Sequence, residues 1–517
     1  MKRNILITFI LFSIQAGAQI PDDAIRYSWY PQNGTARNLA IGGVMGSLGG
    51  DITAAFVNPA GLGFYKTGEV VLSPGILLGK NTANYRGSLT ENKRNSFGFG
   101  PSGWIQGFGN KYNPGQSYAV SIGVSQVANF NNNIYYSSLN NYSSFSEQFA
   151  EEFAKSGRSI DEVLYSNSSM PYTAAPALYT YLIDTVTVGS AIQVKAAPEY
   201  ILDAGQALRQ EMRKKTSGGI YELALAYAQN NKDKWLMGAT LGIPIVSYKS
   251  NTVFTESDTS ANRFNKFNSF TYTDDFKTSG AGLNLKLGFI YRPQEYLRVG
   301  FAFHTPSFMM LTDTHTSTLN TQTETDSGKL ANLSVSSQTF TNDQPGKSRY
   351  FQSSPWRAIL SVSYVFREVE NVKKQRAFIS ADIEYVNHRG SRFSSNNEEP
   401  TEDEKVYYKG LNNVVKSIYK GTFNAKVGGE LKFNTIMGRL GFAYYGNPYK
   451  DKQLKTNMVL LSGGLGYRDK GFFIDLSYVY NMTKDVNMPY RLEDRDNTFA
   501  NIKQRNGQVM ASIGWKF

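Results

Sequence analysis

Short segments in which apolar and polar residues alternate recur along most of this chain. The last of them runs from Gly507 to Phe517, with apolar side chains on one face and mainly polar ones on the other. Successive side chains of a strand point to opposite faces, so this period predicts strands. An apolar lipid face, a polar lumen face and a final aromatic are typical of the closing strand of an outer-membrane β-barrel. A half-buried edge strand of a soluble protein shows the same pattern, so the other segments decide the matter.

Several internal segments carry charge on their second face. Lys286 opposes the apolar face of 283–291, and Asp382 and Glu384 oppose that of 379–385. A soluble sandwich buries one face and merely wets the other, whereas charge on so many second faces fits a barrel with lipid outside and a polar lumen inside. The pattern predicts a transmembrane antiparallel β-barrel of about fourteen strands. These strands are 68–79, 95–108, 117–129, 219–229, 234–247, 279–292, 295–305, 356–367, 376–387, 422–433, 436–446, 457–468, 471–482 and 507–517.

The connections between these strands alternate between short and long, as a barrel with turns at one end and loops at the other requires. The short ones are 230–233, 292–294, 434–435 and 469–470, with moderate ones near 109–116 and 368–375. The long ones are 130–218, 248–278, 306–355, 388–421 and 483–506, with shorter ones at 80–94 and 447–456. We expect the long connections to be exposed polar loops, because they are rich in Ser, Thr, Asn and Asp.

One long loop holds a predicted helix. Ser144 to Glu147 forms a capping box, and Phe145, Phe149 and Phe153 recur at helical spacing before Gly157. A second short helix is predicted to start at 159–162. The aromatic stripe has two interpretations: buried packing against its own loop, or an apolar surface that captures ligand outside the cell.

The N-terminus predicts export. Residues 1–18 combine Lys2 and Arg3, an apolar run and a small-residue cleavage site, which together indicate a secretory signal peptide. No later stretch reaches the roughly 18 apolar residues that a membrane helix needs. Cys is absent, so disulfides and thiolate chemistry are excluded. We therefore expect the protein in the outer membrane of a Gram-negative cell.

Composition is consistent with this location. Aromatic residues make up 14% of the chain while the mean hydropathy is −0.37, as expected for aromatic girdles combined with polar loops. The formal net charge is +12. A basic surface can indicate nucleic acid, but with a signal peptide the nearer anionic partner is lipopolysaccharide. We expect no nucleic-acid binding.

The segment 19–66, before the first strand, differs from the rest. It is dense in Gly and Ala, which let backbones pack closely, and an Asn-Pro-Ala-Gly sequence at 58–61 marks a turn. A compact apolar segment upstream of a barrel with a polar lumen fits inside that lumen as a plug. The alternative is a tail that merely leads into the first strand.

Three stretches of this segment, 37–43, 49–55 and 58–62, closely resemble the N-terminal hatch of the FadL/TodX family of outer-membrane channels. The resemblance implies that 19–66 plugs a barrel formed by 67–517. It also implies a substrate class of long-chain fatty acids, aromatics or other lipophilic compounds. Such a ligand would be captured in a surface groove, held in the lumen and released sideways into the membrane. The connections 306–355 and 388–421 are long and polar for the family.

The resemblance also assigns candidate residues. It maps Asn58, Pro59, Ala60 and Gly61 onto the plug motif, and it places the Phe145/Phe149/Phe153 helix in the loop where the family has helices beside its capture groove. It implies no cofactor. The terminal Phe517 is the signal that the barrel assembly machinery would recognise.

Further candidates come from the strands themselves. The predicted second strand contains Gly98, Gly100, Pro101 and Gly103, and proline cannot donate to a ladder. We expect a kink or bulge there, which is either structural or a lateral gate. Inward cations that could pair with a fatty-acid carboxylate are Lys286, Arg298, Lys426 and Lys432. The alternative is that lumenal carboxylates neutralise them, namely Glu222, Asp382, Glu384, Glu430 and Asp475.

No motif indicates catalysis. The three histidines are far apart, and the chain has no nucleophile elbow, metal-ligand cluster or phosphate loop. The Asp313-Thr314-His315 sequence resembles a catalytic dyad only in spacing. We expect no enzyme activity, metal or cofactor, and a passive channel for hydrophobic small molecules. The alternatives are a general porin and a surface receptor or adhesin.

Overall fold

The computed structural model describes residues 21–113, 115–165, 168–260, 262–325, 327–366, 376–452 and 454–517. The predicted signal peptide at 1–18 and the predicted connection at 368–375 lie outside the described residues. Within the described ranges, no helix has both the length and the apolar character needed to cross a membrane.

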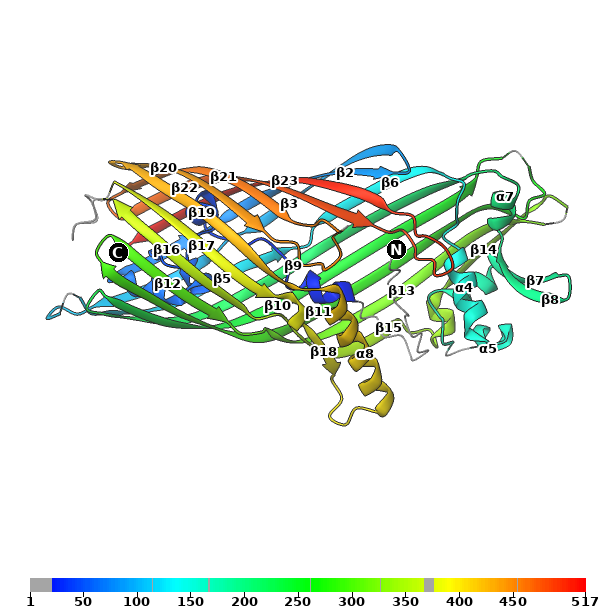
Figure 1. The fold of residues 1–517 in the computed structure, drawn as a ribbon, viewed down its shortest axis with the longest axis horizontal. Coiled ribbons are helices and arrows are strands. Elements are labelled where there is room, and N and C mark those ends of the chain that lie inside the picture. The colour runs from blue at the N-terminus through cyan, green and yellow to red at the C-terminus, as the bar shows by residue number, and fades with distance from the viewer. Residues whose placement is uncertain are drawn as a thin grey trace, which may run out of the picture.

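A closed ring of fourteen antiparallel strands forms the wall of the described molecule (Figure 1). The ring runs through β1 (Gly68–Leu72), β4 (Ser102–Gly109), β5 (Ser117–Asn129), β9 (Leu208–Asn231), β10 (Trp235–Asp258), β11 (Phe267–Gln294), β12 (Leu297–His304), β16 (Arg357–Phe366), β17 (Ala377–Asn387), β19 (Gly421–Phe433), β20 (Ile436–Tyr445), β21 (Met458–Asp469), β22 (Phe472–Asn487) and β23 (Ala500–Lys516). Each of the fourteen predicted strands corresponds to one position in this ring, so the predicted barrel is confirmed.

The ring closes where the last strand meets the first. Trp515 is paired with Val70, and the backbones of Phe517 and Gly68 exchange two hydrogen bonds of 2.9 and 3.0 Å. Ile513, Trp515 and Phe517 are exposed on the outer face. The predicted apolar face of this strand therefore points outward, and its polar face points into the lumen.

The short turns lie at one end of the barrel, together with the C-terminus, and we call this the inner end (Figure 1). Asn434 and Lys470 have positive φ values of 53° and 46° there, as tight two-residue turns require. The long connections lie at the opposite, outer end. The predicted phase is confirmed for the described strands, because the predicted short and long connections lie at opposite ends.

The wall continues far beyond the ring at the outer end. β11 has 28 residues, whereas about 9–11 suffice to cross a bilayer. The added strands are β2 (Pro74–Tyr85), β3 (Ser88–Phe99), β6 (Asn132–Asn140), β13 (Phe308–Glu324), β14 (Leu330–Ser336), β15 (Gly346–Ser353) and β18 (Arg392–Ser395). The prediction that 80–94, 248–278 and 306–355 are polar loops is therefore wrong. Their Thr and Ser residues alternate with buried apolar ones, which suits strands with one buried face and one face in water.

Helices and a small hairpin lie in the long connections, most of them toward the outer end and one, the helix of 402–418, near the middle of the long axis (Figure 1). They are α4 (Glu147–Ser156), α5 (Ile160–Leu164), α6 (Ala174–Tyr179), α7 (Glu199–Asp203), η2 (Ser337–Phe340), η4 (His388–Gly390), α8 (Glu402–Ile418) and the hairpin β7 (Ile183–Val188) with β8 (Ala191–Ala196). The predicted helix start at 159 is confirmed, because Ser159 and Glu162 form a capping box. α8 was not predicted, although Thr401 and Glu404 form the same signature.

The segment before β1 folds into α1 (Pro21–Arg26), α2 (Ala36–Ala40), α3 (Ala54–Val57) and η1 (Pro59–Phe64). Its backbone forms hydrogen bonds with inward-facing side chains on opposite sides of the ring. Ala36 N donates to Ser512 on β23 (2.8 Å), Met45 N donates to Asp382 on β17 (2.9 Å), and His304 on β12 bonds Val57 O (2.7 Å). Because these strands lie on different sides of the wall, the segment lies across the lumen. We call residues 21–64 the plug.

Candidate functional site

The Asn58-Pro59-Ala60-Gly61 motif lies where η1 meets the wall. The Asn58 side-chain oxygen accepts a hydrogen bond from Ala60 N (3.2 Å) and so caps η1. Its amide nitrogen donates to the carbonyls of Phe289 on β11 and Phe301 on β12, both at 3.3 Å. One side chain therefore caps the plug helix and ties the plug to two strands.

Glycines on the wall let the plug approach this closely. A Cβ at Gly238 would lie 2.5 Å from the carbonyl carbon of Pro59, and a Cβ at Gly300 would overlap the Gly46 carbonyl. Neither position can carry a side chain without moving the plug backbone. The glycines at these positions of the wall thus allow the backbone of the plug to lie in direct contact with the strands.

Two of the four candidate lumen cations are paired with lumenal carboxylates. Lys286 Nζ lies 2.5 Å from Glu222, and Lys426 Nζ lies 3.6 Å from Glu384. Lys426 also donates to the Gln32 side chain of the plug (2.6 Å). These contacts follow the alternative interpretation, in which lumenal acids neutralise the cations.

The other two candidate cations lie at the inner end. Arg298 donates to the Leu48 carbonyl of the plug (2.8 Å) and lies 4.6 Å from the Phe64 ring centroid. Arg298 and Lys432 both line a cavity of about 1030 Å³ between the plug and the inner turns. The structure therefore does not bring the four candidate cations together in one site.

The wall is interrupted at the predicted kink. Gly98 lies in β3 and Gly103 in β4, while Gly100 and Pro101 separate the two strands. On the side of this point toward the inner end, β4 pairs with β5. On the side toward the outer end, no backbone ladder joins β3 and β6, although both strands are fully described. We call this boundary between β3 and β6 the seam.

Both sides of the wall contain an irregularity at the level where the seam begins. The registers of β3 on β2 and of β4 on β1 differ by one position, and β5 shifts against β9 between Gln126 and Ala128. Bulges of this kind bend a strand away from its neighbour. Two bulges on facing strands therefore end the ladder and begin the seam.

A cavity of about 470 Å³ lies against the seam. Its lining includes Leu77 and Leu78 of β2, Phe130 between β5 and β6, and Trp29 of the plug. Leu77 is half-buried, whereas the neighbouring Leu78 is exposed on the outer surface. The cavity thus has lining residues from the lumen and from the outer face of the wall.

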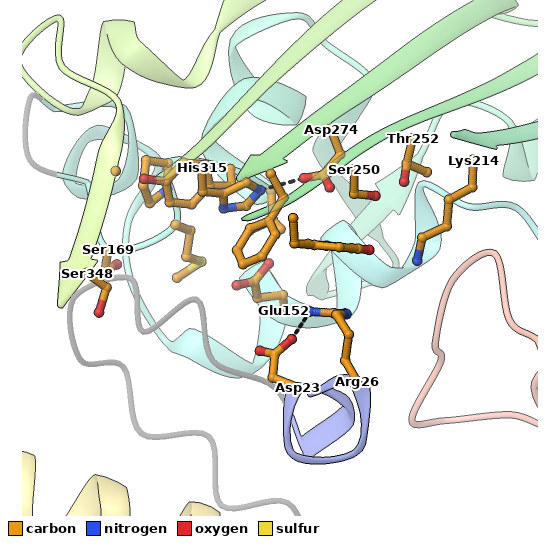
Figure 2. Close-up of a pocket in the computed structure, with 17 residues that line it drawn as sticks. Asp23, Arg26, Glu152, Ser169, Lys214, Ser250, Thr252, Asp274, His315 and Ser348 are labelled. Carbon is orange, nitrogen blue, oxygen red and sulfur yellow. Dashed lines mark hydrogen bonds and ion pairs between the residues drawn. The ribbon is translucent and has the colours of Figure 1, made fainter. Parts of the chain in front are cut away.

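A second cavity, of about 380 Å³, lies nearer the outer end (Figure 2). In Figure 2, Asp23 and Arg26 extend from α1 on one side of the cavity. The strands supply the other side, with His315 from β13, Asp274 from β11, and Ser250 and Thr252 from β10. The rings of Tyr172, Tyr248 and Phe276 also line it. The lining combines aromatic surface with hydroxyl and charged groups, as small-molecule sites do.

Arg26 and Tyr248 line both cavities. The guanidinium of Arg26 lies 4.3 Å from the Tyr248 ring centroid and forms an ion pair with Asp23 of its own helix. The two cavities are therefore neighbours, and this cation–π pair stands between them.

The predicted aromatic stripe is buried. Phe145 stacks on Phe254 of β10 with 4.4 Å between ring centroids, and Phe149 lies 5.6 Å from Tyr272 of β11. Phe153 belongs to the same buried cluster. These side chains pack against the extended strands instead of forming an exposed landing surface.

The Asp313-Thr314-His315 sequence does not form a dyad. His315 Nε2 lies 2.5 Å from Asp274, while Asp313 accepts a hydrogen bond from Thr278 (2.7 Å). Among the described residues, no group of three or more His, Asp or Glu side chains is arranged to hold a metal ion.

The plug residues that reach the cavities were missed by the sequence analysis. Trp29, Tyr30 and Asn33 line the seam cavity, and Asp23 and Arg26 line the outer one. Two signals were available in this short stretch, namely its aromatic residues and the Asn33-Gly34 dipeptide that marks a turn.

No family model and no curated protein matches the chain at a significant level. Solved structures do. A crystal structure of a FadL homologue from Pseudomonas aeruginosa superimposes with a TM-score of 0.52 at 13% identity, covering 95% of this chain and 99% of that one. The toluene transporter TodX from P. putida gives a TM-score of 0.51 at 12% identity, covering 94% and 99%. At this identity the likeness establishes the fold, over almost the full length of both chains. The chain therefore shares its fold with the FadL/TodX family, as the hatch residues predicted.

Proposed function

We propose that the protein carries hydrophobic small molecules passively across the outer membrane and releases them through the seam. The observation that supports this most directly is the adjacency of the two cavities. Arg26 and Tyr248 line both the outer cavity and the seam cavity, so a ligand that passes this pair moves from one cavity to the other. The seam cavity in turn has lining residues from the outer face of the wall.

The driving force is the removal of apolar surface from water. Each Å² of apolar area that leaves water contributes about 25 cal/mol, so an aromatic cavity retains an alkylbenzene or an acyl chain while it crosses the polar outer leaflet. Release into the bilayer interior keeps that area buried. Sideways exit therefore needs no external energy source, whereas exit into the periplasm would return the ligand to water.

The polar groups of the outer cavity suit a ligand with a polar head. Arg26 offers a cation, while Ser250, Thr252 and Ser348 offer hydroxyls. Burial raises the pKa of the Glu152 carboxyl in this lining above its ordinary value. We infer that amphiphiles and aromatics both fit, with the head at Arg26 and the apolar part against Tyr248 and Phe276.

Uptake measurements test this function. Cells that make the protein should take up labelled oleate or a labelled alkylbenzene faster than cells without it. Gln504 lines the seam cavity, and Gln504→Trp should lower uptake several-fold by filling that cavity. Asn501→Trp is the matched control, because Asn501 lies exposed on the same strand. Equal uptake with and without the protein would rule out transport of these compounds.

A surface receptor is the second candidate, and the outer extension favours it. Strands of 24 to 28 residues raise a folded structure well beyond the bilayer. Phage or ligand adsorption to cells whose protein lacks the hairpin 183–196 would separate this role from transport, since the hairpin forms its own two-stranded sheet.

A further inference from the structure

Side chains take over the hydrogen bonding along the seam. The antiparallel register of the β4–β5 ladder continues upward, so that residues of β3 face residues of β6, yet no backbone ladder joins the two strands. Instead, side-chain donors reach carbonyls on the opposite edge. They are Arg86 to Leu139 O (3.2 Å), Thr90 to Tyr135 O (2.7 Å), Arg94 to Asn132 O (3.2 Å) and Asn129 to Phe97 O (3.4 Å).

At the bottom of the seam the donor comes from the plug. The Asn33 amide nitrogen donates to Phe99 O of β3 (3.0 Å) and to Gln126 O of β5 (2.8 Å). Its oxygen accepts from Gln508 Nε2 of β23 (3.2 Å) and from Gly34 N (3.0 Å). One side chain thus bridges the two edges of the seam and is itself held in position.

The strands cannot supply this donor themselves. Extending the β4–β5 register by two residues from the Ser102–Val124 pair puts Gly100 opposite Gln126. The Gly100 N–H already bonds Ser73 O (2.8 Å), and the next residue, Pro101, has no N–H. A carbonyl left without a donor away from water costs about 1–3 kcal/mol. Asn33 removes that cost for two carbonyls at once, and in doing so it sets the distance between the edges.

We propose that Asn33 is a positioning residue that latches the seam to the plug. While the plug is seated, the two Asn33 bonds hold the edges of the seam together. When the plug shifts, both carbonyls lose their donor, water takes its place and the bottom of the seam widens. This inference deepens the proposed function. It rests on that function only where it takes the opening as the route by which ligand is released.

The position of the latch connects it to ligand capture. Asn33 follows Arg26 by seven residues along the plug, and Arg26 lines the outer cavity. A ligand that displaces Arg26 from Tyr248 therefore pulls on the segment that carries the latch. Ligand binding in the outer cavity is thereby coupled to opening of the seam.

Distance measurements across the seam test the latch without relying on transport. The chain has no Cys, so two cysteines introduced at Phe97 and Val124, both exposed, accept spin labels for pulsed EPR. Asn33→Ala should lengthen this distance by roughly 3 Å, the width of an intervening water. Asn33→Asp, which keeps the size but loses the donors, should do the same and carries the test if the alanine variant does not fold.

Two controls make the result specific. Labels at Trp104 and Ile122 span the β4–β5 ladder, where the residues are directly paired, and their distance should stay constant in every variant. Gln32→Ala removes the contact of the adjacent plug residue with Lys426 but keeps both Asn33 bonds to the edges of the seam, so it should leave the Phe97–Val124 distance unchanged.

An unchanged Phe97–Val124 distance in the folded Asn33 variants would overturn the proposal, as would equal lengthening in Gln32→Ala. Uptake is measured on the same proteins. Widening without any uptake by the wild type would support the latch and reject transport, whereas uptake without widening would reject the latch and leave transport standing.

Discussion

Two buried carboxyl groups lie at the start of α4, and one of them joins this segment to an extended strand. Glu256 of β10 accepts hydrogen bonds from the Ser144 hydroxyl, Phe145 N and Gln210 Nε2, and Ser144 N donates to Glu147 (2.7 Å). Burial raises the pKa of each carboxyl to about 7. For Glu147, the Arg495 guanidinium at 3.2 Å acts in the opposite direction.

From these raised pKa values we expect the packing of α4 on the extended strands to depend on pH. The folded state binds the proton of each carboxyl more tightly than the unfolded state does. The contribution of this proton to stability is therefore fully present below the unfolded pKa near 4.5, and it is lost as pH rises through the folded pKa of about 7. For one fully buried carboxyl this loss is on the order of 3 kcal/mol.

Glu256→Gln should remove much of that dependence, because the amide keeps hydrogen-bonding groups at this position and cannot ionise. We expect hydrogen exchange in residues 144–156 to be several-fold slower in the variant than in the wild type at pH 8, and similar in the two at pH 5. Equal exchange rates at pH 8 would contradict the assignment.

Among the elements, α4 shows how a helix is held on an extended sheet. Its phenylalanines are buried against β10 and β11 instead of facing ligand. The sequence spacing indicated an apolar stripe correctly. It did not indicate what covers that stripe, because the strands that cover it are rich in Ser and Thr, as exposed loops are.

Phe149→Ala should therefore loosen the packing of α4 on the extended strands and leave the ring intact. Phe149 is 1% exposed, and emptying such a site costs about 3–5 kcal/mol. Limited proteolysis should cut 144–205 much faster in the variant, while the heat-modifiable gel shift of the folded barrel persists. Tyr165→Ala, at a position that is 71% exposed, is the control and should change neither readout.

The seam is an element-level feature that the sequence indicated only in part. Proline in a predicted strand pointed to the interruption at Gly100–Pro101. The matching bulge at Val127 had no such signal, because a bulge is a relation between two paired strands.

For the whole molecule, the plug is the feature that bears on whether the lumen is open. Its contacts with β12, β17 and β23 place it across the lumen. A general porin requires an open bore, so the seated plug argues against that alternative.

Removal of residues 21–64 should convert the protein into an open pore. In planar bilayers we expect small or undetectable single-channel currents from the intact protein and large, stable currents from the deletion variant. The ring strands retain their ladders in the variant, so the gel shift of the folded barrel checks assembly. Comparable large currents from the intact protein would show that the plug does not seal the bore.

The sequence by itself determined the wall. Side-chain alternation and the lengths of turns are local properties, so fourteen strands, their apolar outer faces and the end that carries the short turns could all be predicted from neighbouring residues. It also indicated the plug, because closely packed backbone needs small residues.

The tertiary structure alone decided the rest. The latch joins Asn33 to Phe99, Gln126 and Gln508, and the outer cavity joins α1 to β10, β11 and β13. These residues lie tens to hundreds of positions apart, and nothing in their local patterns specifies which of them meet. Their meeting depends on how the chain closes on itself, since each side chain is placed by a different element.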